Sequence, residues 1–162
     1  MDSTYDFTGL GIPYEGTSLL NRPAGWNYAL HKHLCFEFTL VIKDASSITI
    51  DEKEHILTRG MVTPVPPGIY HIQQSKAGFR RLGIWLSSYP EDSLIKILSS
   101  NINYPLIATI PYFLEFIPAI EEHLHFQTLL STQKLRNILE NILLCCVDHV
   151  KKQDKTRSFG EN

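Results

Sequence analysis

The stretch HKHLCFEF, residues 31–38, contains three potential metal ligands within seven residues. Side chains alternate between the two faces of a β-strand, so His31, His33 and Glu37 would share one face of a continuous strand. His71 follows a sharp turn, PPG, and would reach the same region from a neighbouring strand. Three neutral imidazoles and one carboxylate suit a divalent transition metal such as Zn, Fe, Ni or Mn. The four residues are therefore a candidate metal-ligand set, or else hydrogen-bonding groups for a small molecule without an ion.

The segment FRRLGIWLS, residues 79–87, supplies further candidate ligand-binding side chains. One of the adjacent Arg80 and Arg81 must face inward if the segment is a strand. An inward Arg81 with Trp85 would suit a sugar or carboxylate ligand through bidentate hydrogen bonds and stacking. The alternative is a surface arginine beside a packed tryptophan, since the strand's phase is open. Tyr28 is a further ligand-binding candidate, although core packing is the usual role of such a residue.

Other reactive residues have simpler interpretations. His123 and His125 form another HxH pair, but on a helix they lie about 200° apart and cannot share an ion. His55 follows a charged hairpin turn and is expected at the surface. Of the adjacent Cys145 and Cys146, one is expected to pack as a small hydrophobe in a helix seam. Three cysteines are poor material for a disulfide framework and favour a reducing compartment.

The elements that would position these residues change in character near residue 90. Residues 26–87 read as short strands: a long one over 30–42, a turn at KDASS, a hairpin around EKE and a last strand over 79–87. This spacing predicts an antiparallel sandwich or barrel. Helices are predicted from about 92 to 100, from 111 to 126 with a break at Pro118, and from 132 to 150. The polar tail after Lys151 is expected to fray.

Two apolar surfaces need partners. The first strand carries Leu34, Phe36, Phe38, Leu40 and Ile42 on one face, which is a natural docking site for helices. The last helix carries a wide apolar stripe that includes Leu139 and Leu143. We expect one side of this stripe to dock on the barrel and the other, over 132–150, to form a homodimer.

The spacing of Gly25, His31, His33 and Glu37, and of Gly60, Pro66, Gly68 and His71, resembles the two signature motifs of the cupin superfamily. The resemblance implies a cupin-like jelly-roll barrel, a double-stranded β-helix, in which His31, His33, Glu37 and His71 occupy the four metal-binding positions. Asp44 stands where the first motif ends in Gly, and Ser75 where the second ends in Asn. Neither departure affects the ligand set.

Over roughly residues 5–150 the chain resembles the N-terminal effector-binding and dimerisation domain of AraC-type transcription regulators. This resemblance implies an arm (1–24), an effector-binding barrel (25–90), an antiparallel helical dimerisation segment (91–152) and the start of a linker (153–162) to a DNA-binding domain beyond this chain. It implies a small-molecule sensor with no catalytic residues, not an enzyme. The alternative is a small metal-dependent cupin enzyme, an isomerase or dioxygenase, that uses the three histidines and the glutamate.

Charge and hydropathy limit the partners. The 162 residues carry 15 Lys and Arg against 17 Asp and Glu, a net charge of −2. Duplex DNA binding needs clustered positive charge, so DNA is expected only through the absent domain. The apolar runs are shorter than the roughly 18 residues of a membrane span, and the first ten residues lack a signal-peptide pattern. A cytoplasmic protein without membrane contact is predicted.

Overall fold

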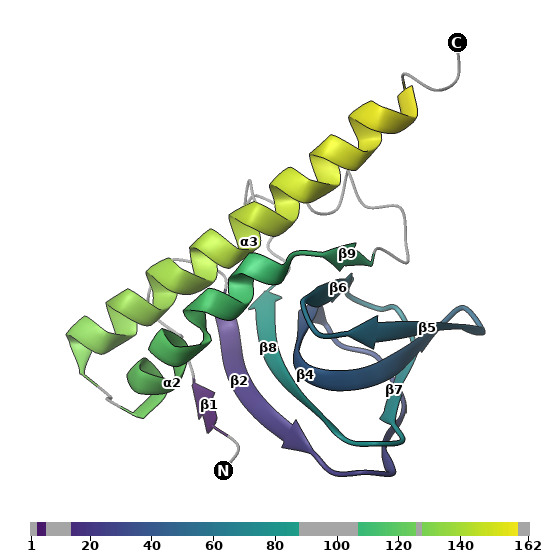
Figure 1. The fold of residues 1–162 in the computed structure, drawn as a ribbon, viewed down its shortest axis with the longest axis horizontal. Coiled ribbons are helices and arrows are strands. Elements are labelled where there is room, and N and C mark those ends of the chain that lie inside the picture. Colours follow the sequence, from purple (N-terminus) through teal and green to yellow (C-terminus); the bar gives the residue numbers. More distant parts are fainter. Residues whose placement is uncertain (1–2, 6–13, 88–106, 126–127, 159–162) are drawn as a thin grey trace.

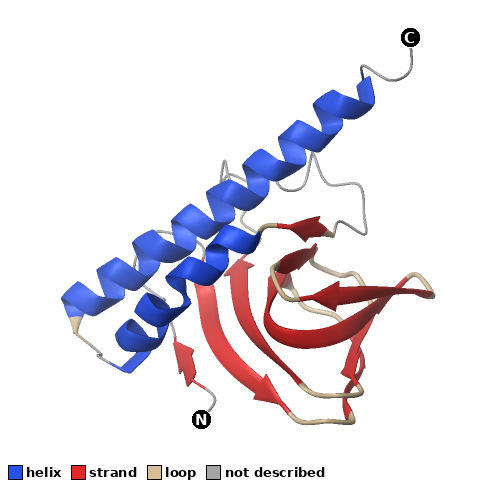
Figure 2. Ribbon diagram, viewed as in Figure 1, coloured by secondary structure: helices blue, strands red, loops and turns tan. Residues whose placement is uncertain are grey.

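The computed structural model describes residues 3–5, 14–87, 107–125 and 128–158 (Figure 1). Strands come first, and the helices follow and lie beside the sheet (Figure 2). The strands are β1 (Ser3–Tyr5), β2 (Tyr14–Arg22), β3 (Trp26–His31), β4 (Cys35–Ile50), β5 (Lys53–Thr58), β6 (Met61–Val65), β7 (His71–Ser75), β8 (Phe79–Ser87) and β9 (Ala108–Thr109). The helical elements are the 3-10 segment η1 (Pro111–Phe116), α2 (Ile117–His125) and α3 (Leu129–Ser158). The predicted class, mainly antiparallel β followed by helices, is confirmed.

The strands form two antiparallel layers that share β4. One layer has the order β1-β2-β8-β4-β6-β9, and in the other β7 pairs with β3 and with the second half of β4, which also pairs with β5. Strand β2 lies within residues 1–24, the interval predicted as an arm, and it pairs with β8 over residues 14–22. The barrel of this structure therefore includes β2 as well as the strands after residue 25.

The predicted turn at KDASS is wrong, because β4 continues through these residues. The register between β4 and β8 shifts between Val41 and Lys43, and Asp44 has a φ of 60°. A bulge of this kind bends a strand and changes which residues face inward. Aspartate tolerates a positive φ better than most residues, which explains how it replaces the glycine of the cupin motif here. The next hairpin is confirmed: Asp51 and Glu52 both have positive φ, as a two-residue type I′ turn requires.

The predicted first strand, residues 30–42, is interrupted by a short connection. Strand β3 ends at His31 and β4 begins at Cys35. The amide of Gly68 donates a hydrogen bond to the His33 carbonyl oxygen at 2.8 Å, which ties this connection to the turn before β7. Gly68 has a φ of 81°, a conformation that glycine adopts without strain. Leu34 lies in the connection and is 86% exposed, so its predicted place on the apolar face is wrong.

The apolar face of β4 receives the helices, as predicted. Alternate residues of β4 are buried in one core with alternate residues of β8 and with α2 and α3 (Figure 1). The largest contributors are Phe36, Phe38, Leu40, Leu82, Ile84, Leu86, Phe113, Ile117, Ile120, Leu135, Leu139, Ile142 and Leu143. Burying one such side chain contributes about 1.5–3 kcal/mol, so this core holds the helices on the sheet.

The helices differ from their predicted bounds. The expected helix over 92–100 lies outside the described residues. The segment 111–126 divides as predicted near Pro118, with η1 before Ile117 and α2 from it. Helix α3 starts at Leu129, where the Ser131 amide donates to the Thr128 hydroxyl oxygen at 3.1 Å, an N-cap contact. The helix continues to Ser158, so the expectation of fraying after Lys151 is wrong.

The apolar stripe of α3 turns mostly toward its own chain. Leu139 and Leu143 are 0% and 1% exposed and pack in the core, so they are not available to a second copy. Leu144, on the outer side, is 59% exposed. Cys146 packs in the core as predicted, and its burial, with a smaller contribution from Cys145, raises the pKa of its thiol to about 12.

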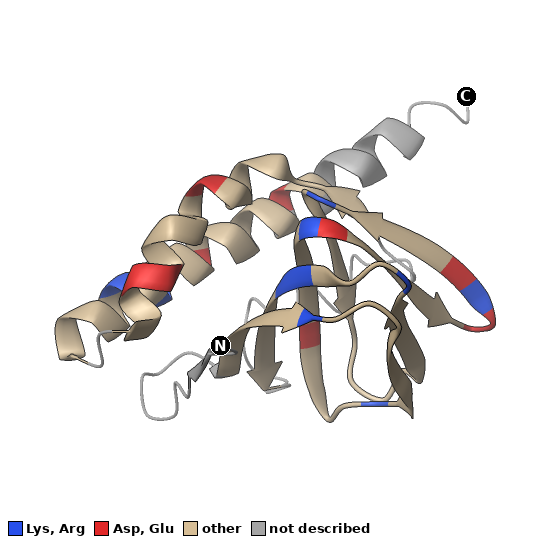
Figure 3. Cartoon of the chain, turned by 60° about the horizontal axis from the view of Figure 1, so that its bottom comes forward, with Lys and Arg blue, Asp and Glu red and all other residues tan. Residues whose placement is uncertain are grey.

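The surface charges are mixed. Lys, Arg, Asp and Glu positions are interspersed along the described strands and helices, and both signs meet at the tip of the β4–β5 hairpin (Figure 3). In the same described ranges, no helix combines the length and apolarity needed to cross a bilayer.

Candidate metal centre

Strand β8 places alternate residues in two different environments. Leu82, Ile84 and Leu86 pack against the helices, while Arg81 and Trp85 face the interior of the barrel and line a pocket. Arg81, and not Arg80, is therefore the arginine that faces inward, a choice that the sequence left open. Arg80 points the other way and forms an ion pair with Glu121 of α2. The two adjacent arginines therefore have different functions in the fold.

Gly83 makes room for the Trp85 side chain. A Cβ atom at position 83 would lie 2.7 Å from Cη2 of Trp85 and 3.2 Å from the hydroxyl oxygen of Ser18. Contacts below 3.0 Å do not occur with real Cβ atoms, so the indole occupies its place only because residue 83 has no side chain. Ser18 is the partner of Gly83 in the β2–β8 register. Together these residues shape one wall of the pocket.

The pocket has a volume of about 330 Å³. It is lined by Ser18, Leu20, Arg22, Trp26, Tyr28, His31, His33, Glu37, Gln73, Arg81 and Trp85. Six of the seven predicted site residues are among these. Sequence reasoning missed the β2 residues because it assigned residues 1–24 to an arm. The segment TSLLNR has adjacent leucines and no clear apolar and polar alternation, so its sequence gives no signal for these residues.

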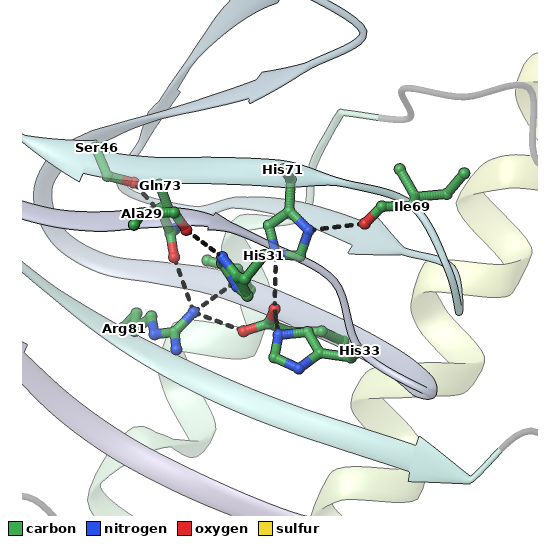
Figure 4. A network of polar contacts seen from close by, with 10 residues as sticks. Ala29, His31, His33, Ser46, Ile69, His71, Gln73 and Arg81 are labelled. Atoms are coloured by element: carbon green, nitrogen blue, oxygen red, sulfur yellow. Dashed lines mark hydrogen bonds and ion pairs between the residues drawn. The ribbon is translucent and has the colours of Figure 1, made fainter.

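The four predicted metal ligands form one cluster, and three of them, His31, His33 and Glu37, line this pocket. Figure 4 shows the three histidines close together. One donor atom from each of His31, His33, Glu37 and His71 lies within 4.8 Å of the others. His31 comes from the end of β3, His33 from the connection, Glu37 from β4 and His71 from the start of β7. They therefore converge from three strands and a loop, instead of from one face of a single strand. His71 and Glu37 are buried, and the other two are half-buried.

Backbone contacts fix which nitrogen of two histidines faces the cluster. Nδ1 of His31 lies 2.8 Å from the Ala29 carbonyl oxygen, and Nδ1 of His71 lies 3.1 Å from that of Ile69. A carbonyl oxygen can only accept, so each Nδ1 carries the proton and donates it. In the neutral ring, Nε2 is then left with a lone pair. This is the arrangement in which histidine ligands of metals are held by an outer partner.

Glu37 is the centre of the polar contacts. Its Oε2 lies 3.0 Å from Nε2 of His33 and 3.2 Å from Nε2 of His71. Its Oε1 accepts a hydrogen bond from Nη1 of Arg81 at 2.8 Å. Burial by itself would raise the pKa of Glu37, but the contacts with His33 and His71 and the charge of Arg81 outweigh it and hold the pKa well below its usual range. Glu37 is therefore a carboxylate at neutral pH.

His31 is suited to the neutral form that a metal requires. Burial, together with the neighbouring His71 and His33, lowers the pKa of His31 below its ordinary value of 6.5, although the hydrogen bond to Ala29 opposes this. Nε2 of His33 is buried and, among the described residues, has no hydrogen bond of good geometry despite its 3.0 Å contact with Glu37. A cation shared by the Nε2 lone pairs and the Glu37 carboxylate would be stabilised by both. The donor set therefore fits a divalent transition metal.

Arg81 anchors the other side of the site. Its side chain is 93% buried, and its Nη1 donates to Glu37, to the Thr39 hydroxyl at 2.9 Å and to the Gln73 amide oxygen at 2.9 Å (Figure 4). Gln73 in turn contacts Ser46 at 3.5 Å. This network holds the Glu37 carboxylate in a fixed orientation between the arginine and the histidines.

The remaining candidates lie apart from the site. His123 is half-buried and His125 exposed on α2, and neither joins His55 or the cluster. His55 is half-buried on β5, less exposed than predicted. Tyr28 is 50% exposed at the pocket rim and makes an edge contact with His31, with ring centres 4.2 Å apart.

Comparison with known proteins finds similarity to solved structures alone. No family model matches the chain, and no curated protein sequence does. Similar solved structures include a cupin superfamily protein of Desulfitobacterium hafniense (20% identity, 54% of this chain and 78% of that one, TM-score 0.46). Another is a protein of unknown function, SPY1581, from Streptococcus pyogenes (19% identity, 46% of this chain and 65% of that one, TM-score 0.44). A third is oxalate decarboxylase of Bacillus subtilis (17% identity, 53% of this chain and 25% of that one, TM-score 0.47). The Desulfitobacterium protein and a protein of Shewanella frigidimarina are named as cupins. The matched region is about half of this chain and covers 65% of the streptococcal protein and a quarter of the decarboxylase.

These neighbours correct one expectation. The prediction that the chain is not an enzyme is wrong as an exclusion, because the similar structures include an enzyme, oxalate decarboxylase, and the described residues form a His and Glu cluster that could hold a metal. The decarboxylase structure is described as containing Mn(II) centres. Likeness at this level of identity concerns the fold alone. The function of this chain has to be argued from its own site.

Proposed function

We propose that this chain is a metal-dependent cupin that binds one divalent transition metal and, beside it, one small molecule. The observation that carries the proposal is the convergence of histidine Nε2 atoms on the Glu37 carboxylate, with the Nδ1 atoms of His31 and His71 held by backbone carbonyls. The adjoining pocket of about 330 Å³ lies within the range of small-molecule sites, at its lower end.

The residues of the chain have distinct tasks in this proposal. The Ala29 and Ile69 carbonyls orient two imidazoles, and Arg81 orients the carboxylate. A bound ion would act as a Lewis acid toward an oxygen of the pocket molecule. Burial of His71 and Glu37 keeps water away from the inner side of the site, which strengthens every charge interaction there. The arrangement supports metal-dependent catalysis as well as metal-dependent binding.

The test is metal retention. Protein stripped with a chelator is dialysed against Mn²⁺, Co²⁺, Ni²⁺ or Zn²⁺, and bound metal and the melting temperature are measured. We expect one ion per chain, a raised melting temperature, and a loss of about tenfold or more in affinity in His71→Gln, as for other removed ligands. His123→Gln, from the helical HxH pair, is the matched control and should bind normally. Wild-type protein that retains no ion and shows no thermal shift refutes the metal centre.

The second candidate is the effector-sensing domain of an AraC-type regulator. The observation that favours it is that β8 contacts the pocket with one face and the helices with the other. A small-molecule effector at Arg81 and Trp85 would thus be one residue away from Leu82 and Ile84 in the helix core. Hydrogen exchange should then change in α2 and α3 on ligand binding. A reading frame that continues into two helix-turn-helix patterns would support the DNA-binding part, and exchange that changes only around the pocket would count against it.

We also propose that a homodimer forms through the outer side of α3, within 132–150. The core-facing residues are excluded, so the contact would centre on the exposed Leu144. Leu144→Glu should produce monomers in light scattering at micromolar concentration without lowering the melting temperature. Ile56→Glu, on β5 and equally exposed, is the matched control and should leave the dimer intact. Monomeric wild-type protein refutes the proposal.

A further inference from the structure

We infer that the small molecule bound beside the candidate metal centre is a carboxylate anion held by Arg81 and Arg22. This rests on the proposed function and names its ligand class. Of the charged side chains that line the pocket, Arg22 and Arg81 are positive and Glu37 is negative. The lining thus carries one excess positive charge before any metal is added, and three with a divalent ion. A binding site with this excess attracts anions and stabilises them.

Arg81 provides the geometry for anion binding. Its three hydrogen bonds within the described residues all use Nη1, and they hold the guanidinium in place. Nε is buried and has no hydrogen-bond partner in the described part of the chain. The edge formed by Nε and Nη2 is therefore the part of the group that is left for a ligand. A guanidinium edge matches the two oxygens of a carboxylate and binds them through parallel hydrogen bonds.

The two arginine side chains of the lining favour an anion over a neutral sugar. Sugar hydroxyls donate as well as accept, so a sugar site needs acceptors that are still available. Oε1 of Glu37 and Oε1 of Gln73 already accept hydrogen bonds from Arg81, while the Ser18 hydroxyl can serve as donor or acceptor. A carboxylate needs only donors, which the arginines supply.

The walls of the pocket indicate that the anion has an organic part. Trp26, Tyr28 and Trp85 contribute flat apolar surface, and the Trp85 ring lies 5.8 Å from Cζ of Arg81. A carboxylate can place its charge at Arg81 and its carbon skeleton against these rings, whereas inorganic phosphate cannot. The small volume limits the ligand to a small organic acid.

The experiment uses pairs of probes that differ in charge but little in shape: acetate and acetamide, succinate and succinamide, benzoate and benzamide. Xylose and inorganic phosphate are added as a neutral sugar and an inorganic anion. Both tryptophans of the chain line the pocket, so fluorescence titration, confirmed by calorimetry, reports binding. We expect at least one carboxylate to bind about tenfold or more tightly than its amide, as a charged hydrogen-bond pair provides.

The variants assign the effect to the pocket. Arg81→Gln and Arg22→Gln should each reduce the preference for carboxylate over amide severalfold. Arg80→Gln is the matched control, because Arg80 is the next residue on the same strand and faces α2. Arg22 lies at the end of β2 and has no contact with Glu37 among the described ion pairs, so Arg22→Gln tests the inference even if Arg81→Gln does not fold.

The titrations are made with metal-free and metal-loaded protein, which separates this inference from the proposed metal centre. A preference for carboxylates that persists in a chain unable to retain metal supports the inference while the metal centre fails. The inference is overturned if amides, xylose or phosphate bind as tightly as the carboxylates. It is also overturned if Arg80→Gln weakens the preference as much as the pocket variants, or if no carboxylate binds at about 1 mM in either form.

Discussion

Replacing Glu37 by glutamine removes one charge from a buried network and leaves the shape of the side chain nearly unchanged. In the metal-free protein Glu37 balances Arg81 across 2.8 Å, with the two side chains 4% and 8% exposed. The glutamine variant keeps a hydrogen-bond acceptor for Nη1, but the guanidinium becomes a buried charge without a counter-charge. Thr39 and Gln73 remain as neutral acceptors and offset part of this loss.

The expected effect is large compared with the stability of a domain. Breaking a buried ion pair by removing one partner costs about 3–5 kcal/mol, against a total free energy of unfolding of about 5–15 kcal/mol. The same chain offers a matched surface pair. Arg80 and Glu121 are 29% and 38% exposed, and a pair of this kind contributes about 0.2–1 kcal/mol. Glu37→Gln should therefore destabilise the protein several times more than Glu121→Gln.

The assay is urea unfolding at neutral pH with chelator present, because bound metal would stabilise the wild type separately. The double variant Glu37→Gln/Arg81→Gln should lose less stability than the two single variants together, by about 0.5–3 kcal/mol, since it leaves no unpaired buried charge. Equal effects of Glu37→Gln and Glu121→Gln, or strictly additive losses in the double variant, would refute the description of Glu37 as the counter-charge of Arg81.

Two further predictions test other parts of the structure. Gly83→Ala places a Cβ atom 2.7 Å from Trp85 Cη2, so it should displace the indole, change the tryptophan emission and destabilise the fold by about 1–3 kcal/mol; unchanged emission would contradict the close contact. The stability of metal-free protein should decrease as the pH falls through about 6.5, because the pKa of His31 is lower in the folded state and the unfolded chain takes up the proton first. It should decrease further below about 4.5, because the folded-state pKa of Glu37 is depressed and protonation again favours the unfolded chain. Thermal melts between pH 4 and 8 provide the measurement. A stability that stays constant or rises toward acid pH would contradict both pH predictions.

His31, His33 and Glu37 could be predicted to lie close together because they fall within seven residues, and the second motif added His71 from a neighbouring strand. Alternation of apolar residues in β4 likewise predicted that Phe36, Phe38 and Leu40 face the helices, and the core confirms it. Such patterns express burial, which acts residue by residue along a strand. The path of the chain between His31 and Glu37 is less local. The break at residues 32–34 depends on a hydrogen bond from Gly68, more than thirty residues away, and no periodicity indicates it.

The continuity of β4 was mispredicted for a related reason. KDASS has the composition of a turn, but residues 45–50 find partners in β5 and β7, and those pairings extend the strand instead of reversing it. The phase of β8 also depended on tertiary contacts: Arg80 and Arg81 are identical residues, and only the position of α2 and of Glu37 distinguishes them. Ser18 and Arg22 were missed because β2 precedes both motif blocks and contains no residue type that indicates a site by itself.

Arg80 and Arg81 connect the pocket to the helices through β8, and this connection matters for either candidate function. Arg81 contacts the pocket, and Arg80, the next residue, is paired with Glu121 of α2. Protein interiors are close-packed, so a displacement of β8 at Arg81 would have to move Leu82 against the helix core or stretch the Arg80–Glu121 pair. A catalyst benefits if the ligand is held by side-chain movement alone, since the metal ligands then keep their geometry. A sensor requires the strand itself to move. The Arg80–Glu121 ion pair would therefore keep its geometry on ligand binding in an enzyme and change it in a sensor.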